Sequence, residues 1–154
     1  MEAAEEERPQ REQAVARLVR AGELLVSGEH PDEMLGFFSP DFAFHGPGEF
    51  ESDLDGLLAY FASLREAFDD RSIRRGIVVV EGTTIACQTW IEGTFVREFA
   101  QSPVGPLAPN GRRIVFDLIN VFVTDDAGRL LHEYVRTDNH TLLQELRFPN
   151  VVDA

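Results

Sequence analysis

The residues best able to do chemistry lie on a predicted strand close to the C-terminus. Residues 121–146 predict a strand, an acidic turn containing Gly128, a returning strand and a short helix. Successive side chains of a strand point to opposite faces, so one face of the returning strand carries His132, Tyr134, Arg136 and Asp138. The other face carries Leu131, Glu133, Val135 and Thr137. Because the first face combines an aromatic ring with a guanidinium and a carboxylate, we interpret it as one wall of a pocket.

Two other predicted strands carry side chains that could face the same pocket. Gln88 and Trp90 share one strand face, and Trp90, the chain's single tryptophan, suits either a pocket wall or the core. Asn120 interrupts an otherwise apolar strand. A buried amide needs a partner or a ligand, because burying it unpaired costs about 1–3 kcal/mol. Tyr60 borders the apolar stripe of a predicted helix and is a further candidate for substrate contact.

The sequence predicts neither a metal site nor a cofactor. The four histidines, His30, His45, His132 and His140, have no recognisable ligand spacing. Cys87 is the single cysteine, so an intrachain disulfide is excluded. It lies in an apolar strand, where we expect an inert thiol of the core.

Composition narrows the class of protein. A chain of 154 residues that is 44% hydrophobic and contains 12 Phe can form one domain with a substantial core. The net charge of -13 and the pI near 4.6 argue against binding to nucleic acid, which requires a basic face. Neither a membrane-spanning stretch nor a signal peptide is recognisable, so we expect a cytoplasmic protein that does not bind membranes.

The order of elements predicts an α+β fold. We expect a disordered acidic lead-in at 1–11, one domain at 12–147 and a C-terminal tail at 148–154. Apolar residues at helical spacing predict a first helix that ends near Gly28, and Pro31 opens a short second helix. Ser52 or Asp53 is expected to cap a third helix.

Strands follow the helices. We expect a short strand at 41–45, longer strands at 73–81, 84–96 and 112–124, and then the returning strand. Helices followed by consecutive antiparallel strands are typical of an α+β domain.

The chain resembles the SnoaL-like polyketide cyclases, a branch of the nuclear transport factor 2-like cone folds. The resemblance covers about residues 12–146 and depends on the order and spacing of several short motifs. These are Asp41–Gly46, Phe68–Asp70, Gly93–Phe95, Pro109–Arg113, and Glu133-Tyr134 followed by Asp138 and Leu142–Leu146. It implies a curved antiparallel sheet wrapped around about three N-terminal helices, forming a cone with an internal pocket for a hydrophobic small molecule.

In this family a carboxylate after the last strand is the general acid/base, and the resemblance assigns that catalytic role to Asp138. A carboxylate in an apolar pocket has a raised pKa, which suits proton transfer in an aldol ring closure. The alternative is that Asp138 caps the final helix, unless Thr141 and Gln144 form a capping box and leave it free. Arg136 could anchor a substrate carboxylate or enolate, or pair with Asp138.

Other positions agree only partly with the family. His45 stands where the family often has a histidine or aromatic residue facing the cavity, although it could equally be a hydrogen-bonded residue outside the site. Phe95 stands where the cyclases usually have a histidine, and the loop after it is longer than theirs. The related limonene-epoxide hydrolases require Arg-x-Asp on the strand that here reads Gln88-Thr89-Trp90, so epoxide hydrolysis by that route is not expected.

Three hypotheses follow. The first is a ring-closing or isomerising enzyme of secondary metabolism, such as antibiotic biosynthesis, with substrate contacts from the candidates named above. The second is a module that binds a hydrophobic ligand without turnover. The third is a domain whose outer sheet face serves dimerisation. A homodimer is expected on separate grounds, because the convex face would expose Val115, Ile119, Val121, Val123, Leu131 and Val135.

Overall fold

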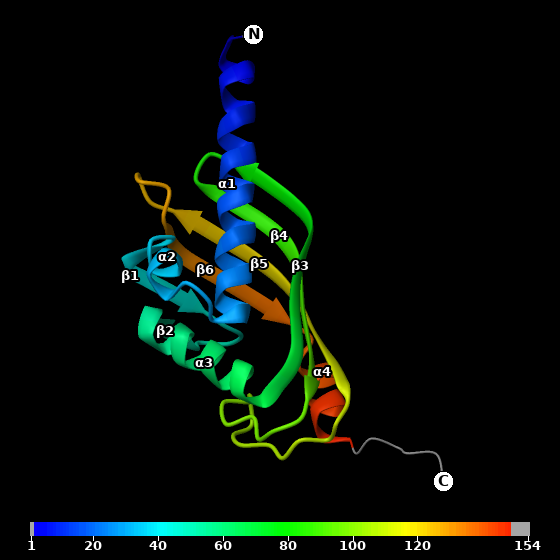
Figure 1. Cartoon of the computed structure of the whole chain (residues 1–154). Coiled ribbons are helices and arrows are strands. Elements are labelled where there is room, and N and C mark those ends of the chain that lie inside the picture. The colour runs from blue at the N-terminus through cyan, green and yellow to red at the C-terminus, as the bar shows by residue number, and fades with distance from the viewer. Residues whose placement is uncertain (1, 149–154) are drawn as a thin grey trace.

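A curved six-stranded sheet forms the body of the molecule, and the first helix crosses its concave side (Figure 1). The computed structural model describes residues 2–148. Its elements are α1 (Glu2–Ser27), α2 (Pro31–Leu35), β1 (Phe38–His45), β2 (Glu51–Asp53), α3 (Leu54–Ala67), β3 (Phe68–Glu81), β4 (Thr84–Phe95), β5 (Arg113–Thr124), β6 (Leu130–Thr137) and α4 (Asn139–Arg147). The strand order is β2-β1-β6-β5-β4-β3. The predicted α+β class and the wrapped, cone-like sheet are confirmed.

One strand pairing differs from the antiparallel sheet that the sequence predicts. The strands β3 to β6 pair antiparallel in chain order. In contrast, β1 lies parallel to β6, with Phe44 opposite Glu133 and His45 opposite Tyr134. The chain makes this parallel contact only after passing through α3 and the four strands β2 to β5, which is the long connection that parallel pairs require. The sheet is therefore mixed.

The first helix begins at Glu2, so residues 2–11 are helical rather than the expected disordered lead-in. Alanine, glutamate, glutamine and arginine favour helix there, and Arg11 forms an (i, i+4) ion pair with Glu7 at 3.4 Å. Residues 3–13 are exposed, and this end of α1 projects beyond the sheet (Figure 1). Of the expected tail at 148–154, residues 149–154 lie outside the described part of the chain.

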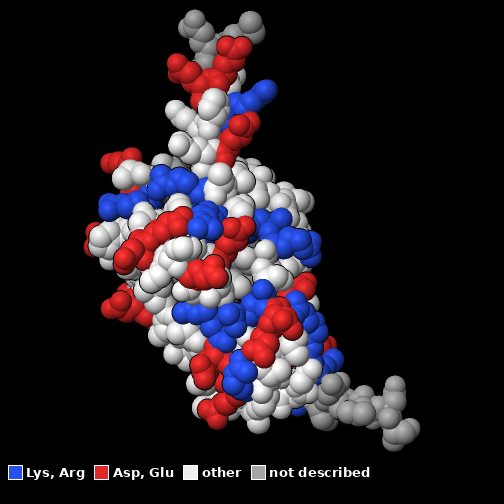
Figure 2. All heavy atoms as spheres, viewed as in Figure 1, with Lys and Arg blue, Asp and Glu red and all other residues white. Residues whose placement is uncertain are grey.

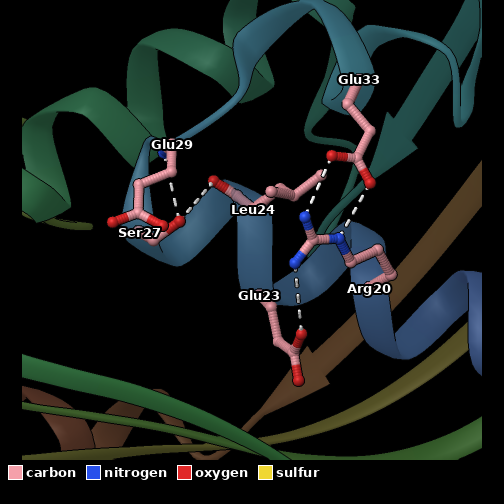
Figure 3. Close-up of polar contacts among 6 residues, drawn as sticks. All are labelled: Arg20, Glu23, Leu24, Ser27, Glu29 and Glu33. Carbon is pink, nitrogen blue, oxygen red and sulfur yellow. Dashed lines mark hydrogen bonds and ion pairs between the residues drawn. The ribbon is translucent and has the colours of Figure 1, made fainter.

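The starts of α2 and α3 follow the predicted local chemistry. Pro31 occupies the first turn of α2. Asp53 caps α3, and its carboxylate accepts a hydrogen bond from the Gly56 backbone N–H at 2.9 Å. A bidentate ion pair attaches α2 to α1, because Arg20 donates to both carboxylate oxygens of Glu33 at 2.9 and 3.0 Å (Figure 3). This ion pair lowers the pKa of Glu33.

Phenylalanine rings fill the end of the cone next to α3. The ring of Phe68 lies 5.0 Å from Phe95, 5.4 Å from Phe99 and 5.5 Å from Phe116, measured between centroids. Three of these four residues are fully buried and Phe116 is nearly so. Phe99 is held there by paired backbone hydrogen bonds with Leu107, within the Pro/Gly-rich loop after β4. This end of the cone is packed as a core.

Arg71 connects the ends of α1 and α3 to the start of β3. Its guanidinium donates to the backbone carbonyls of Val26, Arg65 and Phe68 at 3.0, 2.9 and 2.6 Å. The last turn of α1 contains no basic residue of its own. Arg65 also donates to the Leu25 carbonyl at 2.6 Å, so the two arginines together supply hydrogen bonds and positive charge to the C-terminus of α1.

We predict that Arg71→Met lowers the free energy of unfolding by about 2–4 kcal/mol, because it leaves partly buried carbonyls without their charged donor. Urea unfolding would measure the change. Arg74→Met is the matched control on the same strand, since Arg74 lies over the Trp90 ring at 4.2 Å and should contribute only about 0.5–1 kcal/mol. Equal losses in the two variants would contradict the assigned role of Arg71.

Candidate active site

The strand β6 presents to the interior the face that the sequence assigned to the outside. Glu133 and Val135 are 9% and 7% exposed, whereas Tyr134 is 40% exposed and Arg136 is also exposed. The prediction that Tyr134 and Arg136 line the pocket wall is therefore wrong. The strand begins with two leucines, and the β5–β6 register shifts near its start. Either phase of the alternation was thus compatible with the sequence.

The same inversion occurs on β4. Cys87 and Thr89 are buried on the concave side, while Gln88 and Trp90 lie on the convex side. Gln88 accepts a hydrogen bond from the Ile77 backbone N–H at 3.2 Å. Gln88 and Trp90 therefore do not face the interior, contrary to prediction.

Asp138 occupies the N-cap of α4. Its carboxylate accepts hydrogen bonds from the Thr141 backbone N–H at 3.1 Å and from the Thr141 hydroxyl at 2.7 Å. These two hydrogen bonds lower the pKa of Asp138, and the residue is exposed. This is the capping alternative, with Thr141 bonded to Asp138 rather than replacing it. Arg136 donates instead to the carbonyls of Gly46 and Val135 at 3.0 and 2.7 Å.

His45 and Tyr134 do come together, but on the convex side. Their rings stack with centroids 4.4 Å apart. His45 Nε2 lies 3.2 Å from His132 Nδ1, and His45 Nδ1 lies 3.3 Å from a carboxylate oxygen of Glu51. In the described part of the chain no three histidine, cysteine or acidic residues are grouped so that they could hold a metal ion.

Tyr60 and Phe95 belong to the phenylalanine core. Tyr60 contacts Phe61 and Phe99, with ring centroids 5.7 and 6.0 Å away, and burial raises its pKa to about 12. Phe95 is fully buried and stacks on Phe68. Both side chains thus have packing partners that account for their positions.

Asn120 lies in the interior as predicted, and its hydrogen-bond partner is a residue that the sequence analysis did not select. Asn120 is 2% exposed, and its amide Nδ2 donates to Glu133 Oε2 at 3.2 Å. Nearby, Arg75 Nη1 donates to the Thr89 hydroxyl at 2.6 Å and lies 4.0 Å from Cys87 Sγ. We call Glu133, Asn120, Arg75, Thr89 and Cys87 the interior polar cluster.

Strand register brings the cluster together. Glu133 is opposite Phe122, Asn120 is opposite Cys87, and Thr89 is opposite Arg75. These cross-strand pairs form successive rows on the concave side of β3 to β6. Counting the hairpin register outward from the turn at Gly128 could have located Glu133 beside Asn120, because both would then fall on one face of adjacent strands.

Burial raises the pKa of Glu133 to about 7, against the opposing effects of the Arg75 charge and the hydrogen bond from Asn120. A carboxyl with this pKa exists in both protonation states near neutral pH. Such a group can accept a proton from a bound molecule and return it.

A cleft of about 120 Å³ opens between α1 and the β5–β6 turn. Its lining residues are Gln10, Gln13, Ala14, Arg17, Leu18, Phe37, Ile85, Thr124, Gly128 and Leu130. Ile85 is opposite Phe122, which in turn is opposite Glu133. The cleft therefore borders the row of the sheet that carries the buried carboxyl.

The charged surface gives no sign of a nucleic-acid site on the face shown in Figure 2. Acidic side chains gather at the projecting end of α1, and arginines alternate with acidic residues over the body. No helix in the described range 2–148 is long and apolar enough to cross a membrane.

Comparisons with known proteins agree with the fold. The sequence profile of the SnoaL-like domain family matches residues 15–133. No curated protein matches the chain. The structure of a protein from Jannaschia sp. CCS1, provisionally named a SnoaL-like polyketide cyclase, superposes with a TM-score of 0.73 at 18% identity, covering 89% of this chain and 93% of that one.

Two further structures are similar. IdmH from Streptomyces antibioticus, provisionally named a polyketide cyclase, gives a TM-score of 0.70 at 24% identity, covering 89% of this chain and 98% of its own. SalBIII, described as an epoxide hydrolase/cyclase-like enzyme in pyran ring formation in the polyether salinomycin, gives a TM-score of 0.64 at 17% identity, covering 82% of this chain and 92% of its own. At these identities the likeness concerns the fold.

The raised pKa of Glu133 predicts a pH dependence of stability. The unfolded chain releases this proton near the ordinary pKa of 4.5, whereas the folded protein holds it until about pH 7. The folded state binds more protons within that window, so its free energy of unfolding should fall by about 3 kcal/mol as pH rises through it.

The Glu133→Gln variant has no carboxyl at this position, so its free energy of unfolding should not fall in this way as pH rises. We expect the stability of the wild type relative to Glu133→Gln, measured by urea unfolding, to decline between pH 4.5 and 7. Glu81→Gln, at an exposed glutamate of β3, is the control and should follow the wild type. A wild-type advantage that does not change with pH would contradict the assigned pKa.

Proposed function

Because the chain belongs to the SnoaL-like domain family, we propose that it is an enzyme that transfers a proton on a largely apolar small molecule held in the cone, with Glu133 as the proton carrier. The observation that carries this proposal is a buried carboxyl whose pKa lies near 7 and which receives a hydrogen bond from Asn120. The reaction class is ring closure or isomerisation next to a carbonyl, as in polyketide cyclisation. Such acid–base chemistry needs no cofactor.

The structure favours Glu133 over Asp138 for this role. Asp138 is exposed, accepts two hydrogen bonds from Thr141 and has a lowered pKa, so it stays ionised and is a poor proton donor at neutral pH. Glu133 lies on the concave side, where the neighbouring side chains of Phe122 and Val135 are apolar and buried. Its pKa gives it comparable amounts of base and acid at the pH of the cell.

Each step uses one proton. The Glu133 carboxylate takes a proton from the carbon next to a carbonyl, and the C–H electron pair forms the enolate double bond. In an aldol closure the enolate carbon attacks a second carbonyl of the same molecule, and Glu133 returns the proton to the oxygen formed there. Asn120 donates to one carboxylate oxygen and so fixes the orientation of the group in both states.

The second candidate is a module that binds a hydrophobic ligand without turnover. The capping role of Asp138 favours this candidate, because the residue expected to be the acid/base is exposed at the start of α4 and does not lie in the interior. In that case Glu133 and Asn120 would serve only to hydrogen-bond the ligand.

We predict that Glu133→Gln lowers the rate of solvent-deuterium exchange into enolisable bicyclic ketones by about 10²–10⁴-fold, the usual contribution of a positioned acid/base. Proton NMR in D₂O measures the exchange. Asp138→Asn is the control and should retain the wild-type rate, since Asn caps about as well as Asp. Exchange that persists in Glu133→Gln would exclude the proposed carrier, and a ketone that binds the wild type without exchange would favour the binding module.

We further propose a homodimer formed through the convex sheet face. Side chains from five strands lie on it in a row of cross-strand partners, Val79, Ala86, Val121, Tyr134 and His45. Beside this row Ile77 is 66% exposed and Ile119 is 52% exposed. Exposed aliphatic groups in such number on one face are typical of an interface. Val135, expected on this face from the sequence, is buried on the other side.

We predict that Ile119→Arg converts a dimer into a monomer, because a two-fold interface places the new charge in the contact from both subunits. Size-exclusion chromatography with light scattering would measure the molar mass of the wild type and the variant. Leu35→Arg is the matched control, since Leu35 is similarly exposed but lies on α2. A wild type that is monomeric at micromolar concentration would remove this proposal.

A further inference from the structure

Arg75 is half-buried, and its guanidinium is in contact with side chains of two strands and lies close to one helix. Its Nη1 donates to the Thr89 hydroxyl on β4 at 2.6 Å, and its guanidinium carbon lies 5.6 Å from the centroid of the Phe122 ring on β5. On the third side α1 passes close by at Gly22, where an added Cβ would come within 2.8 Å of Arg75 Nη2. The absence of a side chain at Gly22 therefore lets the helix approach the guanidinium.

One donor of this guanidinium has no hydrogen-bond partner. Arg75 Nε is buried, and no acceptor bonds to it in the described part of the chain. Asn120 Oδ1 is the other buried side-chain atom in the same condition. Buried polar atoms are nearly always hydrogen-bonded, so an unpaired donor and an unpaired acceptor in one cluster indicate where a bound molecule would contact the protein.

The charge of Arg75 is also not neutralised by contact. Arg75 takes part in none of the ion pairs formed within residues 2–148. Its field nevertheless reaches the Glu133 carboxyl and opposes the effect of burial on that group's pKa. A negative charge that develops near Glu133 would be stabilised by the same field.

We propose that Arg75 binds the substrate oxygen on which negative charge develops when Glu133 removes a proton, its Nε–H donating to that oxygen. The inference rests on the proposed function and specifies its substrate as a compound whose carbonyl oxygen points toward β3. As Glu133 takes the proton from carbon, the C–H pair forms the carbon–carbon double bond and the C=O π pair moves to oxygen. One negative charge thus passes from Glu133 to the oxygen, while Arg75 keeps all its protons.

The test uses 4-nitrophenol as a probe, because its phenolate is a stable oxyanion with a visible absorbance. The binding is measured in Glu133→Gln protein, which has no proton carrier, so the result does not depend on whether Glu133 is catalytic. We expect the bound probe to ionise at a pH about one unit lower than in solution, as an anion does beside a guanidinium. Adding Arg75→Gln to this protein should abolish that shift and weaken phenolate binding about tenfold.

Two further variants keep the result interpretable. Arg74→Gln, at the neighbouring position where the side chain lies over Trp90 on the convex side, should leave the shift unchanged. Gly22→Ala should displace the guanidinium without altering the charge, and should reduce the shift while slightly favouring the helix. This second variant serves if Arg75→Gln fails to fold.

The outcomes are distinct. The assignment would be overturned if bound 4-nitrophenol ionised at the same pH in the Arg75→Gln and Arg74→Gln proteins. It would also be overturned if the Glu133→Gln protein did not bind the probe. A shift that depends on Arg75 supports it even if ketone exchange later excludes Glu133 as the proton carrier.

Discussion

The packing of α1 against the sheet determines which side chains lie inside this molecule. Gly22 lets α1 come close to β3, and the carbonyls at its C-terminal end are held by Arg71 and Arg65. On the concave side that α1 crosses, Glu133 is buried, while Tyr134, one residue later, lies on the opposite, exposed face. The chemistry available to the cone therefore follows from a helix–sheet contact, and only secondarily from the composition of β6.

Burying Glu133 has a cost that packing alone would not justify. An aliphatic side chain opposite Phe122 would fill the same space without desolvating a carboxyl, and such replacements are often neutral or stabilising. The partial compensation by Asn120 leaves one amide oxygen unpaired as well. The proposed proton transfer would give a reason for keeping this polar group at the expense of stability.

The sequence predicted most helices and strands and the local caps, but it missed the helical residues 2–11 and strand β2, and it did not predict which faces of β4 and β6 lie inside. Helical spacing, Pro31 and Asp53 predicted the helices because those signals act within a few residues. The interior face of β6 depended on a contact with distant elements, and the adjacent leucines Leu130 and Leu131 allowed either phase. The parallel pairing of β1 with β6 is likewise nonlocal. Consequently Asn120 was correctly placed inside, whereas its partner Glu133 was assigned to the wrong side.

The separation between Arg75 and Glu133 explains why the carboxyl can change its protonation state. A guanidinium in direct contact would keep Glu133 ionised, and a wholly apolar surrounding in a chain of net charge -13 would keep it protonated. Here the guanidinium is bonded to Thr89 instead, so its charge acts on Glu133 only through space. Burial is the larger effect and raises the pKa of Glu133 to about 7, while the Arg75 charge and the Asn120 hydrogen bond limit the rise. The hydrogen bond from Arg75 on β3 to Thr89 thereby affects the acid–base properties of Glu133, which lies on β6.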